Sequence, residues 1–114
     1  MTSVVNSRTG RVFLTDLREA QGSWQQFAGL MFARSLGGAQ GVLFRPARGI
    51  HTHFMRFPID LIYLDEAHRV CAIREAMPPW RFDLRSAAAV IEVNAGAARA
   101  AEIRICDELS IEAT

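Results

Sequence analysis

The sequence predicts a mainly β (α+β) fold, an antiparallel β-sandwich or barrel with one or two short helices on its rim. Short apolar segments alternate with turn-forming residues along most of the chain, as in all-β domains. Successive strands follow one another without regular helical crossovers, which argues against a doubly wound parallel sheet. The 114 residues, half of them apolar, fit one globular domain spanning residues 1–114.

The first elements expected are one short strand and the principal helix. Residues 11–15 alternate weakly between apolar and polar side chains. Ser23 and Gln26 then form a capping box that opens a helix, which we expect to end at Gly37-Gly38. Its apolar stripe follows helical spacing and consists of Trp24, Phe27, Ala28 and Met31.

The rest of the chain is expected to be strands and turns. The apolar run 59–64 is typical of a strand covered on both faces, and a turn at 65–68 makes it half of a hairpin. Residues 46–49 are expected to form a loop, and Asn94 to cap a short helix through residue 101. The predicted strands are residues 11–15, 42–44, 50–57, 59–64, 69–74, 87–93 and 109–112.

Composition and charge narrow the class of partner and the compartment. All 13 basic residues are arginines, and the net charge of +1 gives no broad surface for binding nucleic acid. No apolar run approaches the roughly 20 residues of a membrane span, and no signal-like segment opens the chain, so we expect a soluble cytoplasmic protein without a membrane partner. Cys71 and Cys106 form no CxxC pair and are expected to be small buried residues in a reducing compartment.

Two histidines suggest a possible metal site. Side chains alternate along a strand, so His51 and His53 share one face of residues 50–57. They could chelate a transition metal, with a carboxylate from Asp60 or Glu92 completing the set. The pattern resembles the His-x-His strand of cupins, but no glutamate follows closely and a third suitable histidine is missing. Histidines that form hydrogen bonds on a half-buried face are the alternative, and no cofactor is favoured.

Two acidic residues stand inside strongly apolar stretches. Burying the carboxylates of Asp60 and Glu92 is costly unless they are paired or hydrogen-bonded. Arg56 and Arg34 are natural partners, because a guanidinium group can form two hydrogen bonds with one carboxylate. The carboxylates could form internal ion pairs or cap loop amides, or they could line a polar pocket that meets a small ligand.

Three stretches taken in order resemble a known family. They are residues 29–34 with 41–44, residues 54–65, and residues 90–96, and they resemble the bacterial and archaeal domain of unknown function 192, also called uncharacterised protein family 0127. The resemblance covers about residues 11–111 and implies a jelly-roll-like β-sandwich with no established activity or cofactor. Many members carry Trp-Met-Lys-Asn where this chain has residues 54–57, and a glycine where it has Cys106.

Three hypotheses about function follow. The preferred one is a non-catalytic binding or accessory module for a small polar ligand or a protein partner. Its candidate residues are His51, His53, Arg56, Asp60, Glu92 and Arg34. One alternative is a cupin-like metal-dependent enzyme that uses His51 and His53. The other is a structural or oligomeric interaction protein with Trp24 and Trp80 on its contact surfaces. No GxSxG elbow or P-loop ending is present to favour another catalytic class.

Overall fold

The computed structural model describes residues 2–20, 40–51, 58–78 and 82–113. The helix predicted from Ser23 to Gly38 lies outside these residues. The second half of the strand predicted at 50–57 and both tryptophans, Trp24 and Trp80, also lie outside them.

The described residues form ten strands and one short helix. The first five strands are β1 (Thr2–Asn6), β2 (Arg11–Leu14), β3 (Asp16–Ala20), β4 (Gln40–Phe44) and β5 (Ala47–His51). The remaining elements are β6 (Ile59–Leu64), β7 (Val70–Met77), β8 (Phe82–Ala87), β9 (Ala89–Asn94), α2 (Ala97–Ala100) and β10 (Leu109–Ala113).

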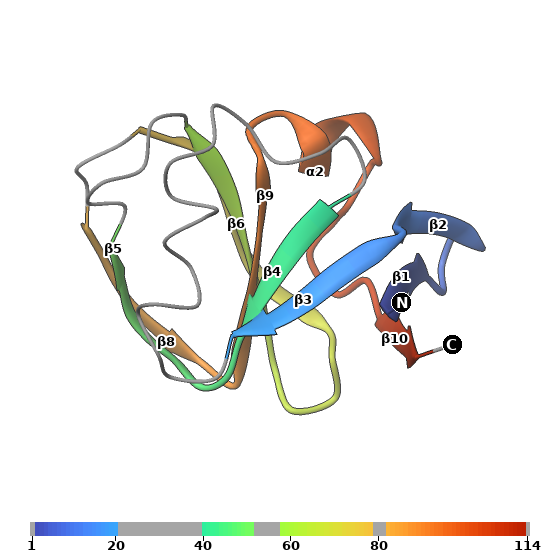
Figure 1. Ribbon diagram of the computed structural model, residues 1–114, viewed down its shortest axis with the longest axis horizontal. Coiled ribbons are helices and arrows are strands. Elements are labelled where there is room, and N and C mark those ends of the chain that lie inside the picture. The colour runs from blue at the N-terminus through green and yellow to red at the C-terminus, as the bar shows by residue number, and fades with distance from the viewer. Residues whose placement is uncertain (1, 21–39, 52–57, 79–81, 114) are drawn as a thin grey trace.

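The strands form a layered, sandwich-like structure. A five-stranded sheet in the order β3-β4-β9-β6-β7 occupies the centre. The three-stranded sheet β10-β1-β2 lies on one side of it and the two-stranded ribbon β5-β8 on the other (Figure 1). The predicted mainly-β fold is therefore confirmed. None of the sheets built from the described strands closes on itself, which favours the sandwich over the barrel.

The centre of the molecule is the strand that the sequence marks most clearly. All six residues of β6 are buried, and the strand pairs antiparallel with β7 on one side and β9 on the other. A strand in this position is covered on both faces, which accounts for its nearly unbroken apolar sequence. The hairpin from β6 to β7 is confirmed, although β7 continues to Met77.

Each face of the central sheet packs on its own apolar core. Val4, Leu14 and Leu109 of the three-stranded sheet meet the side chains of Ile62 and Ile91. On the opposite face the core is smaller and includes Ala47 of the ribbon. Its other buried members are Ile59, Leu61, Tyr63, Met77 and Val90.

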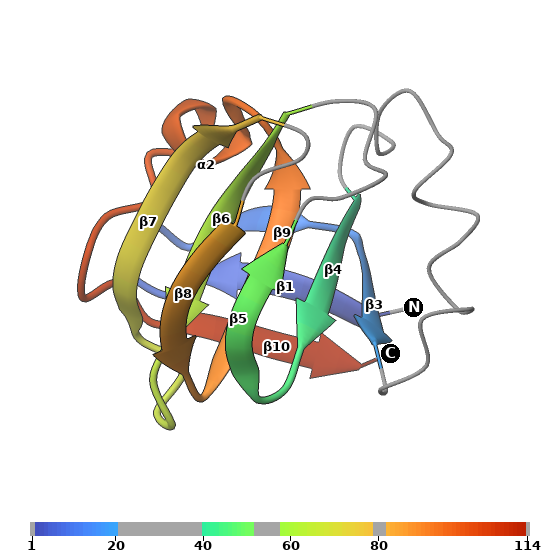
Figure 2. The same ribbon diagram turned by 90° about the vertical axis from the view of Figure 1, so that its left-hand side faces the viewer.

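The ribbon corrects two of the predicted elements. The loop expected at 46–49 is largely strand β5, and the single strand expected at 87–93 is divided into β8 and β9 at Ala88. Ala47 is buried and Ala87 packs against the same core, so both backbones stay extended after leaving the central sheet. The ribbon therefore bends over one face of β6 and β9 (Figure 2).

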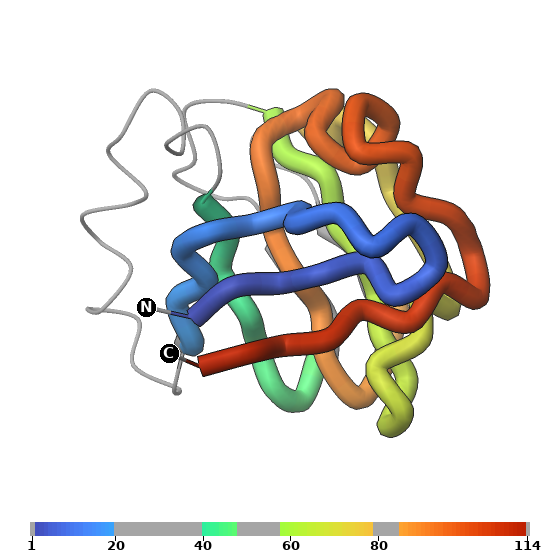
Figure 3. Tube along the Cα trace, turned by 90° about the vertical axis from the view of Figure 1, so that its right-hand side faces the viewer, coloured from blue at the N-terminus to red at the C-terminus, as the bar shows by residue number. Residues whose placement is uncertain are grey.

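Two strands near the N-terminus were not predicted. β1 lies between β10 and β2, and its pairing with β10 places the two ends of the described chain side by side (Figure 3). β3 pairs with β4 in parallel, an exception to the expected antiparallel pattern. β3 has few apolar side chains because it is an edge strand of the described five-stranded sheet. β1 is the middle strand of its sheet, but only Val4 and Val5 among its five residues are apolar, so it lacks a clear strand pattern.

Candidate functional site

The structure does not describe the side chains of four of the six candidate residues. Arg34, His53 and Arg56 lie outside the described residues. His51 ends β5, where its backbone pairs with Phe82, and its side chain is not described. The metal pair and the two arginine partners therefore stay predictions. Within the described residues, no three His, Cys, Asp or Glu side chains are placed to hold a metal ion.

Asp60 is buried and accepts three backbone hydrogen bonds. Its Oδ1 accepts the amide of Ala76 at 2.8 Å, and its Oδ2 accepts the amides of Gly96 at 3.0 Å and Ala98 at 3.1 Å. These bonds fasten the start of α2 and the end of β7 to the central strand. Asp60 thus performs the capping that was predicted for Asn94, while Gly96 occupies the N-cap position itself. Of the two interpretations of a buried acid, Asp60 matches the cap on loop amides.

The backbone conformation of Ala76 accounts for the hydrogen bond that Asp60 accepts near the end of β7. Its φ of 50° lies in the left-handed region, which is unfavourable for a residue with a Cβ. The pairing of β6 with β7 shifts register at the same place, between Ile59 and Leu61. Such a bulge leaves an amide without a partner in the ladder, and the carboxylate of Asp60 accepts it.

Glu92 differs from Asp60 in both its face and its surroundings. It lies in β9 opposite Val42 of β4 and Leu61 of β6, on the side of the central sheet that faces the ribbon. We call this side the Glu92 face and define it by Val42, Leu61, Tyr63, Val90 and Glu92. The Glu92 residue is 8% exposed, and among the described residues its carboxylate has no hydrogen-bond or ion-pair partner.

The apolar surroundings decide the protonation state of Glu92. Burial penalises the charged carboxylate and raises the pKa of Glu92 to about 8. The side chain is therefore mostly a neutral carboxylic acid at pH 7. In that form it carries one O–H donor and an acceptor oxygen, so it can hydrogen-bond a polar group brought into contact with this face.

Among the side chains that the structure describes, the charged ones on the Glu92 face lie around this carboxyl group and not against it. Arg18 of β3 pairs with Val42, and Arg74 of β7 pairs with Leu61, so both share the row of Glu92 across the sheet. Adjacent strands are about 4.8 Å apart, which places these two arginines roughly 10 Å from β9. On the ribbon, Arg85 lies over the ring of Tyr63, with its guanidinium carbon 5.5 Å from the ring centroid.

A third buried acid was not singled out by sequence reasoning. Asp107 is 4% exposed and accepts hydrogen bonds from Asn6 at 2.9 Å, from the amide of Arg104 at 2.9 Å, and from Arg8 at 2.7 Å. Burial acts to raise the pKa of Asp107, but the hydrogen bonds from Arg8, Arg104 and Asn6 outweigh it and hold this pKa below its usual value. The network ties the β1–β2 turn to the loop before β10, so its role is structural.

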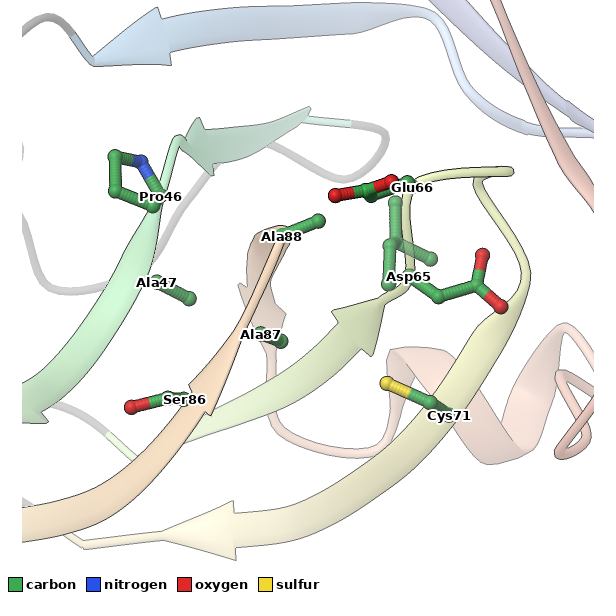
Figure 4. Close-up of a pocket in the computed structure, with 9 residues that line it drawn as sticks. Pro46, Ala47, Asp65, Glu66, Cys71, Ser86, Ala87 and Ala88 are labelled. Atoms are coloured by element: carbon green, nitrogen blue, oxygen red, sulfur yellow. The ribbon is translucent and has the colours of Figure 1, made fainter.

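An open hollow lies at the end of the molecule where the β6–β7 turn meets the ribbon (Figure 4). Its volume is about 450 Å³, and none of the predicted candidate residues lines it. Its lining consists of Pro46, Ala47, Leu64, Asp65, Glu66, Cys71, Ser86, Ala87 and Ala88. Asp65 is engaged in the turn, where its Oδ1 accepts the amides of Ala67 and Arg69, each at 2.9 Å.

The expectation of buried cysteines is wrong. Cys71 and Cys106 are both free and exposed. Cys71 lies at the second register shift between β6 and β7, where the bulge turns its thiol out toward the hollow. Cys106 occupies a tight turn with a φ of 74° before Asp107.

None of the helices in the described part of the chain is long and apolar enough to cross a membrane.

Comparisons with known proteins agree with this architecture. A protein of unknown function from Novosphingobium aromaticivorans has a similar structure, with a TM-score of 0.72 and 26% identity over 96% of this chain and 82% of that one. A proposed transcription regulator from Sinorhizobium meliloti shares the fold with a TM-score of 0.77, at 23% identity over 96% of this chain and 91% of that one.

The sequence comparisons give the family. A UPF0127 protein from Thermococcus sibiricus is 29% identical over 116 aligned positions, which cover 96% of this chain and 74% of the relative. The family model of DUF192, described as "Uncharacterized ACR", matches residues 4–111. With nearly the whole chain matched and the family resemblance of its motifs confirmed, the protein belongs to the DUF192 (UPF0127) family.

Proposed function

We propose that this protein is a non-catalytic binding module whose Glu92 face contacts a small polar ligand. The observation that carries the proposal is the buried carboxyl of Glu92, which has no partner among the described residues. Proteins rarely bury such a group without a hydrogen bond, because its desolvation costs free energy. A ligand that supplies a hydrogen bond to this carboxyl group would recover that free energy on binding.

The contrast with the other two buried acids supports this assignment. Asp60 and Asp107 each accept at least three hydrogen bonds from the protein, as expected of carboxylates that hold a fold together. Glu92 lies among aliphatic neighbours and fastens no loop in the described structure. A carboxyl group that destabilises the unliganded fold is typical of binding sites, where stability is lower than the fold could reach.

The decisive experiment compares the stability and the ligand response of Glu92→Leu with those of the wild type. A leucine fits the aliphatic surroundings, so the unliganded variant should be more stable by about 1–3 kcal/mol in urea denaturation. A panel of small polar molecules is then screened by thermal shift, and the stabilisation seen with the wild type should disappear in the variant. Glu112→Gln, on the exposed end of β10, is the control and should change neither result.

Two outcomes would contradict the proposal. A marked loss of stability in Glu92→Leu would show that the carboxyl group has a structural role like that of Asp60. A ligand response that survives unchanged in the variant would place binding elsewhere on the molecule.

As part of the same proposal we place the protein in the cytoplasm, a compartment that suits two free, exposed thiols.

A further inference from the structure

We infer that the hollow between the β6–β7 turn and the ribbon is a second binding site, which takes a small primary amine with an aliphatic chain. The ammonium group of the ligand contacts the carboxylate of Glu66, and its chain lies on the methyl groups at the floor of the hollow. This site is separate from the Glu92 face, and the inference does not rest on the function proposed above.

The hollow has the size and the apolar floor of a site for a small molecule. Its volume of about 450 Å³ lies within the range of roughly 300–1,000 Å³ that is typical of ligand pockets. Ala47 and Leu64 are 0% exposed and lie at its floor. Ala87 and Ala88 are half-buried, and their short side chains leave the junction of the ribbon with the central sheet open. An aliphatic chain can therefore bury its surface against these side chains.

The β6–β7 turn holds the rim of the hollow in place. The Oδ1 of Asp65 accepts the amides of Ala67 and Arg69, each at 2.9 Å. The amide of Asp65 donates to the carbonyl of Arg69 at 2.9 Å, and the amide of His68 donates to the carbonyl of Asp65 at 3.0 Å. These hydrogen bonds fix the backbone of the turn, so a binding group carried on it loses little conformational freedom when a ligand arrives.

Glu66 supplies the charge that faces the hollow. Its carboxylate points from the turn toward the ribbon, whereas that of Asp65 points away from the ribbon (Figure 4). Glu66 is exposed, and its carboxylate has no hydrogen-bond or ion-pair partner among the residues that the structure describes. Its negative charge is therefore available to a ligand cation.

The described lining contains no positive charge that would favour an anion instead. Asp65 and Glu66 are the only charged residues among the described residues that line the hollow. Arg45 precedes Pro46 in the chain, but its guanidinium group lies 3.6 Å from the carboxylate of Glu19. An ammonium group can donate a charge-assisted hydrogen bond to Glu66, whereas a ligand carboxylate would be repelled by it. Charge complementarity therefore selects an amine over an acid of the same shape.

Cys71 places a chemical reporter in the same hollow. Its thiol points toward the ribbon and donates a hydrogen bond to the carbonyl of Tyr63 at 3.4 Å (Figure 4). Cys71 is exposed, so alkylating reagents can reach it, and a ligand that lies against it should slow the reaction. Cys106 is also exposed but lies in the turn before Asp107, outside the hollow, and serves as an internal control.

The test compares butylamine with butan-1-ol and butanoate, which have chains of similar length. Alkylation of each cysteine by iodoacetamide is followed by mass spectrometry of the full-length protein near pH 7.5, with each probe titrated in turn. We expect butylamine to protect Cys71 at a concentration about fivefold lower than butan-1-ol, as one exposed ion pair allows, and butanoate to protect it least. The rate at Cys106 should not change. Backbone amide shifts in NMR give a second measurement, with the largest changes expected at residues 64–66, 71 and 86–88.

Variants separate the charge of Glu66 from the shape of the hollow. Glu66→Gln keeps the size of the side chain but removes its charge, so butylamine should lose its advantage over butan-1-ol. Ala88→Leu fills the hollow, so none of the probes should protect Cys71 or shift its neighbours. Each rate is compared with that of the same variant without a probe. Glu112→Gln, on the exposed end of β10, removes an acid outside the hollow and should behave as the wild type.

The results also keep this site apart from the Glu92 face. Glu92→Leu should leave the protection of Cys71 by butylamine unchanged, and loss of that protection would show that the two sites are not separate. Equal protection by butylamine and butan-1-ol, or stronger protection by butanoate, would overturn the assignment to an amine. Equal slowing of Cys71 and Cys106, or no protection together with no amide shifts, would overturn the site itself. The proposed function is judged by the stability of Glu92→Leu and by the ligand responses that this variant removes.

Discussion

Asp60 and Glu92 occupy neighbouring central strands and point to opposite faces of one sheet. Asp60 pairs with Val93, so it shares the face that packs on the three-stranded sheet, whereas Glu92 pairs with Leu61 on the ribbon side. The two acids were expected to contribute to one site, and the register of β6 and β9 keeps them apart. Asp60 belongs to the structural framework, which leaves Glu92 as the centre of the candidate site.

The pH dependence of stability should reveal Glu92. Its pKa is raised from 4.5 to about 8 by folding, so between these values the unfolded state releases a proton that the folded state keeps. Protonation of Glu92 therefore contributes to the free energy of unfolding. This contribution is fully present below pH 4.5 and is lost as the pH rises through about 8, a change on the order of 5 kcal/mol. Urea denaturation at pH 5, 7 and 9 should show this decline in the wild type and a nearly flat profile in Glu92→Gln. A wild-type profile that is flat or rises with pH would contradict it.

Asp60→Asn should destabilise the fold without affecting ligand binding at the Glu92 face. The variant loses the negative charge and presents an NH₂ group to at least one of the three amide donors. We expect a loss of about 2–4 kcal/mol in the free energy of unfolding, measured with urea. Asp16→Asn is the matched control on β3 and should change stability by less than about 1 kcal/mol, because its ion pair with Arg18 is long, at 3.6 Å, and the arginine is 62% exposed. A change in the ligand-induced thermal shift of Asp60→Asn, under conditions where the variant is folded, would show that the two faces are coupled.

Much of the fold follows from the sequence because apolar patterning identifies strands in the centre of the sheet. The run from Ile59 to Leu64 was predicted with its observed bounds, since burial on both faces leaves little room for polar residues. β3 escaped prediction because Leu17 is its only described buried side chain. Its parallel pairing with β4 depends on a connection through residues 21–39, which local patterning does not specify.

The site was harder to predict because it depends on strand register. Both buried acids could be identified as unusual from their apolar flanks. Their separation onto two faces depends on the pairing of Asp60 with Val93, and a slip of one residue would reverse the face of every side chain. Asp107 has no strongly apolar flanking sequence that would mark it as buried. Its partners Asn6 and Arg8 are about a hundred residues away in the chain, so local sequence does not reveal them.

Asp107→Asn should lower stability and reduce the sensitivity of the fold to acid. Folding lowers the pKa of Asp107, so the stabilisation it provides is present above its unfolded value of 3.8 and is lost as the pH falls through the lower folded value. At pH 7 the variant should lose about 2–4 kcal/mol, because Arg8 and Asn6 keep their donors but lose a charged acceptor. Between pH 5 and pH 2 its stability should fall less steeply than that of the wild type. Glu108→Gln, an exposed neighbour, serves as the control, and an equally steep acid transition in Asp107→Asn would contradict the assignment.

Cys106→Gly should stabilise the protein. Cys106 has a φ of 74°, a conformation that costs a residue with a Cβ about 1 kcal/mol and that glycine adopts freely. The hydrogen bond from its amide to the carbonyl of Val70, at 2.7 Å, involves only the backbone and remains in the variant. Glycine also makes the unfolded chain more flexible, so the net gain should be about 0.5 kcal/mol, or a few degrees in Tm.

Cys71→Gly is the matched control for that prediction. It removes the same side chain from strand β7, where glycine weakens the strand by roughly 0.5–1 kcal/mol. Thermal unfolding of both variants under reducing conditions should therefore shift Tm in opposite directions, upward for Cys106→Gly and downward for Cys71→Gly. Shifts of the same sign would mean that loss of the thiol, and not the backbone conformation at residue 106, sets the effect. Opposite shifts would assign the effect to the backbone conformation at residue 106.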